Sequence, residues 1–355
     1  MRATSAADIE VHGAGPAGTA AAIAARLCGA DVELYDPSPF PRHRVCGEFL
    51  SPGVLPILDS LGLADDFIAL GPVRYQELVL QFGERSIPVP LPETAFGLSR
   101  YALDGLLARR ALSLGVPLHR ERGPMPTGKP TVVAYGRQAP IAPHIPASNQ
   151  TGPPAHSRSR DNDRLFGFKA HFKGVPASPL TLFFAPGTYV GINHIEGGAT
   201  NICGLASEST LRAHGFDVDS YLSSLRPLAR QLSPLERSMA WMTTGPILFG
   251  QRFHTASEYQ YPAGDAVSFV DPFTGSGILC ALLTGHLAGI HAARGILPRQ
   301  YVARCRRTLR GPYFTASVFR AVLATPFASM LAAHVPAAWL VRGTRPRVSS
   351  MSLQI

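Results

Sequence analysis

Three glycines near the N-terminus have the spacing of a phosphate-binding turn. Gly13, Gly15 and Gly18 follow a short apolar run at 9–11, and an alanine-rich stretch at 19–27 follows them. This order predicts a strand, a tight turn and a helix. Gly13 would form the turn, Gly15 would let the backbone approach a pyrophosphate, and Gly18 would let helix and strand pack closely. The amides at the N-terminus of such a helix attract an anion.

An acidic residue follows the glycines at the distance that nucleotide binding requires. Residues 31–36 predict a second strand that ends in Asp36. A carboxylate roughly twenty residues after the glycine turn accepts hydrogen bonds from a ribose hydroxyl. Nicotinamide and flavin enzymes share this pattern. The pattern therefore predicts a dinucleotide site and leaves the identity of the dinucleotide to the rest of the chain.

Three later segments have the order and spacing of a flavoprotein pattern. Residues 37–52 read PSPFPRHRVCGEFLSP, residues 98–104 read LSRYALD, and residues 263–278 contain GDA followed by DPFTGSGI. They resemble the PFPR…CGE…SP segment, the R-x-x-L-D helix start and the GDA…P…G-x-G flavin signature of one superfamily. This is the geranylgeranyl reductase and aromatic-ring hydroxylase (flavoprotein monooxygenase) superfamily of FAD-dependent oxidoreductases. The resemblance covers most of residues 8–295.

The resemblance implies an α/β fold with FAD as the cofactor. A Rossmann-like FAD-binding domain of the GR2 type would carry an inserted antiparallel β-sheet substrate domain and a C-terminal helical segment. The residues expected to contact FAD, from the glycine motif and the three segments, are Gly13, Gly15, Ala17, Gly18, Asp36, Arg42, Arg44, Cys46, Gly47, Arg100, Gly264, Asp265, Pro272, Gly275, Ser276, Gly277 and Ile278. The five cysteines include no C-x-x-C pair, so no metal site is predicted.

The expected FAD contacts also have physical reasons. Asp265 can accept hydrogen bonds from a polyol such as a ribityl chain, and the bare backbone at Gly275 and Gly277 can close on a planar ring. A helix is expected from residue 278, and its N-terminus would favour negative charge on a reduced flavin. A planar guanidinium fork that suits a phosphate or the flavin edge is available at Arg42, Arg44 and Arg100.

The FAD-binding domain would be discontinuous in sequence, with the substrate domain between its parts. Its expected parts are residues 8–60, 95–140 and 255–295. The substrate domain would comprise residues 61–94 and 165–254. Alternating apolar residues predict a hairpin at 75–90 around Gly83, and further strands within 165–172 and 180–205.

Two further regions accompany these domains. The proline-rich residues 139–164 predict a flexible loop. Residues 296–355 predict a C-terminal helical region. Its apolar run at 318–341 contains Arg320 and two prolines, so a transmembrane helix is not expected. Packing across the enzyme is favoured, and peripheral membrane contact through this segment is the alternative.

The composition limits the partners and the compartment. The chain has 33 Lys plus Arg against 24 Asp plus Glu, a formal charge of +9, but no dense basic run with interleaved aromatic residues. Nucleic-acid binding is therefore not expected, and the charge suits the phosphates of FAD and NADPH. Unpaired cysteines and an N-terminus without an apolar signal segment predict a cytoplasmic protein. The oligomeric state stays open.

The leading interpretation is an NAD(P)H-dependent monooxygenase that acts on a small hydrophobic substrate, either aromatic and polyketide-like or a lipid. NAD(P)H would be a transient reductant, because the chain has no second G-x-G-x-x-G unit. One alternative is a carbon–carbon double-bond reductase of the geranylgeranyl reductase type. The other is a flavin-binding protein without turnover.

The sequence departs from the family patterns in ways that weaken the prediction of any one reaction. Tyr135 stands where the hydroxylases usually carry an acid, and residues 189–194 lack the aromatic segment of the prenyl reductases. A halogenase would need an earlier lysine than Lys129, and a Trp-x-Trp pair that the separate Trp241 and Trp339 do not form. Halogenation is therefore disfavoured.

The catalytic candidates are Cys46, Tyr189 and His194. By resemblance, Cys46 lies near the flavin or the substrate. Tyr189 and His194, with Phe184, are expected to project from the sheet face that covers the flavin. His194 is a hypothetical general base, because imidazole titrates close to neutral pH.

Overall fold

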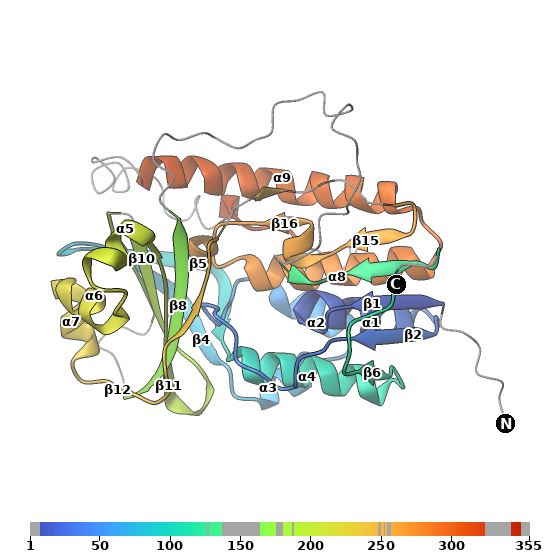
Figure 1. Cartoon of the computed structure of the whole chain (residues 1–355), viewed down its shortest axis with the longest axis horizontal. Coiled ribbons are helices and arrows are strands. Elements are labelled where there is room, and N and C mark those ends of the chain that lie inside the picture. The colour runs from blue at the N-terminus through green and yellow to red at the C-terminus, as the bar shows by residue number, and fades with distance from the viewer. Residues whose placement is uncertain are drawn as a thin grey trace.

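The computed structural model describes residues 8–125, 128–136, 164–174, 180–186, 188–247, 250–251, 253, 257–323 and 342–348. These residues form two units, each built on a β-sheet, and helix α9 (Pro298–Leu323) runs past both of them (Figure 1). The fold is α/β, as the sequence predicts.

The first unit contains a five-stranded parallel sheet with the order β15-β7-β1-β2-β6. Its strands are β1 (Ile9–His12), β2 (Val32–Tyr35), β6 (Leu118–His119), β7 (Thr131–Val133) and β15 (Gln260–Pro262). Helix α1 (Pro16–Leu27) begins directly after the glycine turn that follows β1. The predicted strand, turn, helix and second strand are therefore confirmed.

Helix α8 (Gly277–Ala293) packs against α1 at unusually short range. A Cβ atom added to Gly285 would lie 2.0 Å from the Ala17 carbonyl oxygen, and one added to Gly289 would lie 2.2 Å from the Ala21 carbonyl oxygen. The two backbones touch because glycine faces alanine at each crossing. Helix α4 (Arg100–Ser113) packs beside α1 and completes this layer.

The opposite face of the parallel sheet is polar. Glu10 and His12 of β1 are buried there; the His12 Nδ1 atom lies 2.7 Å from the Tyr135 hydroxyl and its Nε2 atom lies 3.4 Å from the Glu10 carboxylate. Burial lowers the pKa of His12, against the opposing effect of Glu10, so the imidazole is neutral at pH 7. Tyr135, in the position of the hydroxylase acid, is thus hydrogen-bonded to His12 in this buried polar group.

The second unit contains a nine-stranded sheet with the order β12-β8-β11-β10-β9-β4-β5-β3, in which β13 also pairs with β8. Its strands are β3 (Phe49–Leu50), β4 (Val73–Phe82), β5 (Arg85–Gly97), β8 (Leu165–Lys173), β9 (Leu180–Ala185), β10 (Thr188–His194), β11 (Ala199–Ser207), β12 (Glu236–Arg237) and β13 (Met242–Thr244). The hairpin and the later strands agree with the sequence. The expected antiparallel sheet is instead mixed, because β4 pairs with β9 in parallel.

Side chains on the two faces of this sheet differ in character. Even-numbered residues of β8, β10 and β11 face outward into a core closed by α5 (Glu208–Ala213), α6 (Val218–Ser224) and α7 (Arg226–Leu232). Odd-numbered residues of the same strands occupy the inner face. Figure 1 shows these three helices on the side of the sheet away from the first unit.

Shorter elements complete the two units. Leu61 and Leu63, between helices α2 (Val54–Ser60) and α3 (Ala64–Ala69), and Phe67 of α3 lie in the core that contains α1, although the sequence assigned residues 61–94 to the substrate domain. Strand β14 (Gly250–Gln251) pairs with β16 (Ser268–Phe269). Single 3₁₀ turns span Glu196–Gly198, Gly264–Ala266 and Pro272–Thr274.

Two sequence predictions fall largely outside the described residues. They are the flexible loop at 139–164, apart from its last residue, and most of the apolar run at 318–341. Among the described helices, none has both the length and the hydropathy to cross a membrane. The first part of the C-terminal region packs on the enzyme, since the buried Tyr301 hydroxyl donates to the Pro262 carbonyl at 2.7 Å.

The close contact between α1 and α8 predicts that one added methyl group at this contact destabilises the protein. Gly285→Ala should lower the free energy of unfolding by about 1–3 kcal/mol, because the backbones must separate. Gly311→Ala is the matched control, since a Cβ there meets nothing within 4 Å. It should change the free energy by at most about 1 kcal/mol, in the stabilising direction. Chemical denaturation measures both, and equal stabilities would contradict the packing argument.

Candidate cofactor and active site

The three glycines of the first turn are not needed for the same reason. A Cβ on Gly13 would lie 2.4 Å from the Ala134 carbonyl oxygen, and one on Gly18 would lie 1.7 Å from the Gly13 carbonyl oxygen. The protein itself therefore requires these two glycines. A Cβ on Gly15 would come no closer than 3.9 Å to the Arg100 guanidinium, and the backbone there has an ordinary φ of −74°. Nothing within the protein requires Gly15, which indicates a ligand at the N-terminus of α1.

Arginines surround this helix N-terminus. Arg100 donates from Nε and Nη2 to the Asp104 carboxylate, at 2.8 Å each. Burial lowers the pKa of Arg44, and the nearby Arg42 and Arg100 lower it further. Arg44 forms no ion pair within the described part of the chain. Mutual repulsion of this kind would be relieved by a bound polyanion such as a pyrophosphate.

Asp36 lies at the end of β2, where the sequence places a ribose acceptor. Its carboxylate accepts hydrogen bonds from the Ala14 N–H at 2.8 Å and from both terminal nitrogens of Arg42 at 2.8 and 2.7 Å. Burial would raise the pKa of Asp36, but the Arg42, Ala14 and Ser38 hydrogen bonds lower it to about 2. The group is therefore charged at neutral pH, and a ribose hydroxyl would have to share it with Arg42.

The expected flavin signature lies beside α1. The Gly264 N–H donates to Thr284 Oγ1 at 2.8 Å, and a Cβ on Gly264 would lie 2.9 Å from the Ala17 side chain. Gly275 has a φ of 65° and a Cβ there would lie 2.5 Å from Phe49, so packing within the protein already explains this glycine. Gly277 faces open space at the start of α8.

The remaining residues of that segment divide between surface and core. Ser276 is buried and its hydroxyl lies 2.7 Å from the Thr274 hydroxyl. Pro272 is exposed, Asp265 is half-buried, and Ile278 packs into the core.

A buried ionic cluster joins the two units, and the sequence reasoning missed it. Glu48 is inaccessible to solvent and accepts hydrogen bonds from Lys169 Nζ, from His171 Nε2 at 2.6 Å and from the Arg100 N–H at 2.7 Å. Lys169 is also fully buried, and both basic residues belong to β8. Burial would raise the pKa of Glu48, but His171 and Lys169 lower it. The carboxylate is thus held in its charged form.

Two asparagines of the inner face hold the backbone of the segment that contains Glu48. Asn201 donates to the Gly47 carbonyl at 2.9 Å, and Asn193 donates to the Glu48 carbonyl at 3.4 Å. The Cys46 sulfur accepts the Glu48 N–H at 3.4 Å. Cys46 and Gly47 therefore lie between the arginine-lined anion site and the sheet.

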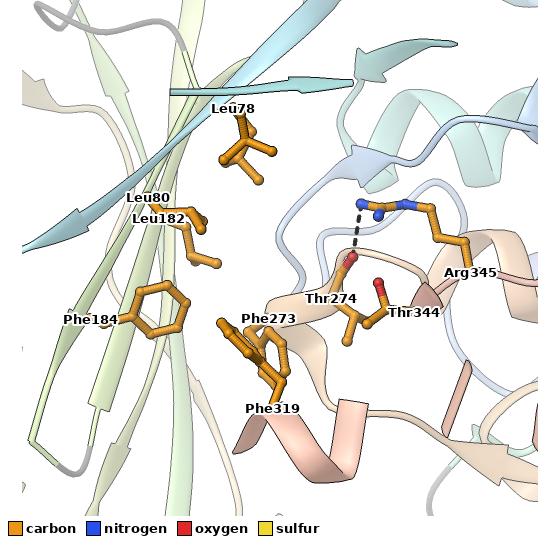
Figure 2. Close-up of a pocket in the computed structure, with 10 residues that line it drawn as sticks. Leu78, Leu80, Leu182, Phe184, Phe273, Thr274, Phe319, Thr344 and Arg345 are labelled. Atoms are coloured by element: carbon orange, nitrogen blue, oxygen red, sulfur yellow. Dashed lines mark hydrogen bonds between the residues drawn. The ribbon is translucent and has the colours of Figure 1, made fainter. Parts of the chain in front are cut away.

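The apolar part of the inner face borders a cavity with a free volume of about 40 Å³. It is lined by Leu78, Leu80, Val89, Leu182, Phe184, Phe273, Thr274, Phe319, Thr344 and Arg345. Figure 2 shows Leu80, Leu182 and Phe184 pointing from the sheet toward Phe273 and Phe319. The lining of the cavity suits hydrocarbon.

Tyr189 and His194 do not share a face. Tyr189 points inward, and its hydroxyl lies 3.4 Å from the Asp271 carboxylate; burial and Asp271 raise the pKa of Tyr189 well above 10. His194 is five positions along an unbroken strand and thus points outward, where its Nδ1 lies 3.3 Å from the Thr200 hydroxyl. The expectation that both residues cover the flavin is therefore wrong for His194.

The arrangement fits FAD. The N-terminus of α1, Arg42, Arg44 and Arg100 would hold the pyrophosphate, and Asp36 would face the ribose. The segment at 264–278 and the inner face of the mixed sheet would hold the flavin. This combination of a glycine-turn parallel sheet and a covering second sheet defines an FAD-binding oxidoreductase fold.

Comparison with solved structures confirms this class of fold. A flavin-dependent brominase superposes with a TM-score of 0.75 at 18% identity, covering 95% of this chain and 93% of that one. A geranylgeranyl bacteriochlorophyll reductase-like protein from Thermoplasma acidophilum gives a TM-score of 0.66 at 18% identity, covering 98% and 94%. The chain shares the fold of these proteins, and these low identities carry no more than the fold.

Sequence comparison adds a partial match. The chain is 37% identical over 90 residues to a menaquinone reductase of Mycolicibacterium smegmatis. The match covers 25% of this chain and spans 22% of the length of that relative. No protein-family model matches the chain.

Neutralising the buried carboxylate should destabilise the protein strongly. Glu48→Gln leaves Lys169 without its counter-charge, and loss of one partner from a buried ion pair costs about 3–5 kcal/mol. Glu84→Gln is the matched control, because Glu84 pairs with Arg230 on the surface. Such exposed pairs contribute about 0–1 kcal/mol. Equal midpoints of urea unfolding for the two variants would show that the buried cluster does not stabilise the fold.

Proposed function

We propose that the protein is an FAD-dependent oxidoreductase that reduces a carbon–carbon double bond in an apolar substrate. The observation that carries this proposal is the divided inner face of the mixed sheet. One part borders the hydrocarbon-lined cavity, and the other part holds the buried pair of Lys169 and Glu48. The partial match to a menaquinone reductase supports a reductase.

The residues of the chain have separate tasks in this reaction. Leu80, Leu182 and Phe184 would bind the hydrocarbon part of the substrate and exclude water. Arg100 and the N-terminus of α1 would fix the cofactor against the sheet. When bound, reduced FAD supplies a hydride. NAD(P)H would be the transient reductant that recharges FAD, and the protein would act in the cytoplasm.

A monooxygenase is the second candidate. The resemblance of residues 98–104 to the R-x-x-L-D segment supports it as much as the first candidate, because the superfamily with this segment includes hydroxylases as well as reductases. The same cavity would then hold an aromatic or polyketide-like substrate. The two reactions differ in their need for oxygen, so they can be separated directly.

The purified protein, loaded with FAD, should be mixed with NADPH and a prenylated quinone under nitrogen and under air. Double-bond reduction predicts a product heavier by about 2 mass units in both atmospheres, whereas oxygenation adds about 16 and occurs only in air. An aromatic polyketide serves as the parallel substrate. Reduction of FAD without any product from either substrate would contradict both reactions, and no reduction of FAD would support a flavin-binding protein without turnover.

A further inference from the structure

Helix α9 carries its exposed side chains along one straight stripe. Residues three or four positions apart lie on the same face of a helix, and the exposed residues of α9 follow this spacing. They include Arg299, Ala303, Arg306, Arg307, Arg310, Phe314, Val318 and Ala321. The opposite face packs on the protein through Tyr301, Cys305, Leu309, Ala316 and Phe319. Figure 1 shows α9 along one side of both units, so the stripe faces away from them.

The first half of the stripe is positively charged. Six arginines and no acidic residue occur between 298 and 323. Arg306, Arg307 and Arg310 are exposed on successive turns, and none of them forms an ion pair with another residue that the structure describes. Arg320, by contrast, reaches the buried Asp271 at 2.7 Å on the inner side of the helix. The first half of the stripe therefore presents positive charge that attracts an anionic surface.

The second half of the stripe is apolar. Phe314 is 68% exposed, and Val318, one turn later, is 48% exposed. The other exposed residues of this half are Gly311 and Ala321. Transfer of an aromatic ring out of water is favourable. This half of the stripe therefore gains more from an apolar medium than from water, directly beside the part that attracts negative charge.

An anionic bilayer matches both halves of the stripe. Lipid phosphates accept hydrogen bonds from the planar forks of the arginines, and the boundary of the hydrocarbon region takes aromatic and aliphatic side chains. The stripe extends for about 28 Å from Arg299 to Val318, at roughly 1.5 Å per residue, and can lie flat on a membrane. A nucleic acid duplex matches only the first half, because its phosphate-lined surface offers no partner for Phe314 and Val318.

We propose that the exposed face of α9 docks on the surface of an anionic phospholipid bilayer. Arg306, Arg307 and Arg310 bind lipid phosphates, and Phe314 and Val318 enter the boundary between headgroups and acyl chains. The helix lies in the plane of the membrane, and its buried face stays packed on the protein. This surface is separate from the proposed FAD site, whose arginines lie at the N-terminus of α1.

Docking through α9 places the apolar cavity near the bilayer. Phe319 lies on the buried face of α9, next to Val318 in sequence, and lines the cavity; its ring centroid is 5.3 Å from that of Phe273. An α-helix with its side chains is about 10 Å across, which sets the distance between the bilayer surface and this wall of the cavity. An apolar substrate dissolved in the membrane would thus be delivered beside its site. This consequence rests on the proposed function, whereas the docking itself does not.

Cosedimentation with lipid vesicles tests the docking without cofactor or substrate. The unaltered protein should bind vesicles of phosphatidylcholine mixed with phosphatidylglycerol and should not bind vesicles of phosphatidylcholine alone. Arg310→Gln should weaken the binding about fivefold, the usual effect of one basic residue near an anionic membrane. Phe314→Ser should weaken it about tenfold or more, because the variant has no ring to transfer out of water.

Helix α4 supplies the matched controls. Arg109→Gln and Leu112→Ser remove the same kinds of side chain from exposed positions of α4, which lies on the other side of the first unit from α9 (Figure 1). Both control variants should bind the mixed vesicles as the unaltered protein does. All four substituted side chains are exposed, so every variant should keep its unfolding midpoint.

Equal vesicle binding by Phe314→Ser and Leu112→Ser, or equal binding to both kinds of vesicle, would overturn the docking. A DNA duplex bound more tightly than the mixed vesicles would also overturn it, since the arginines would then serve a nucleic acid. If the protein reduces a prenylated quinone, Phe314→Ser should slow the reaction about tenfold for quinone held in mixed vesicles, and should leave it unchanged for quinone dispersed in detergent. If no quinone is reduced, the proposed function fails, and the vesicle measurement still decides the docking.

Discussion

The placement of the two units against each other depends on the hydrogen bonds that the buried carboxylate of Glu48 accepts. It receives Lys169 and His171 from the mixed sheet and the Arg100 N–H from the helix layer of the first unit. A buried charge is tolerated only where such donors converge. They also hold Glu48 at a φ of 51°, a left-handed conformation that side chains disfavour. The segment from Cys46 to Glu48 is therefore fixed between the proposed cofactor site and the sheet.

Charged, ionisable and apolar side chains occupy separate regions around the segment from Cys46 to Glu48. Guanidinium groups gather at the N-terminus of α1, ionisable groups occupy the β8 side of the inner face, and hydrocarbon lines the β4 and β9 side. The close contact of α1 with α8 keeps the proposed anion site next to the segment proposed to hold the flavin, because Gly264 packs on Ala17. A phosphate-bearing cofactor and an apolar substrate can thus meet at one face without exposing charge to hydrocarbon.

Local sequence patterns predict the elements better than their contacts. The turn at Gly13 and the hairpin around Gly83 follow from short-range chemistry, and the structure has both. Glu48 and Lys169 are 121 residues apart, so only the fold unites them. The one available signal is the alternation of Lys169 and His171 in an apolar strand. The prediction placed His194 on the wrong face of the sheet. The face on which a side chain lies depends on its position along the paired strand, and residue type alone does not reveal that position.

The central claim is that this chain binds FAD against the N-terminus of α1, and Gly15 tests it most directly. The protein has room for a methyl group at this position, so Gly15→Ala should keep the unfolding midpoint of the unaltered protein. Titration with FAD should show one site per chain in the unaltered protein and binding weaker by about a hundredfold or more in the variant, because the pyrophosphate requires close backbone approach. Equal FAD affinity in both proteins, or none in either, would contradict the account.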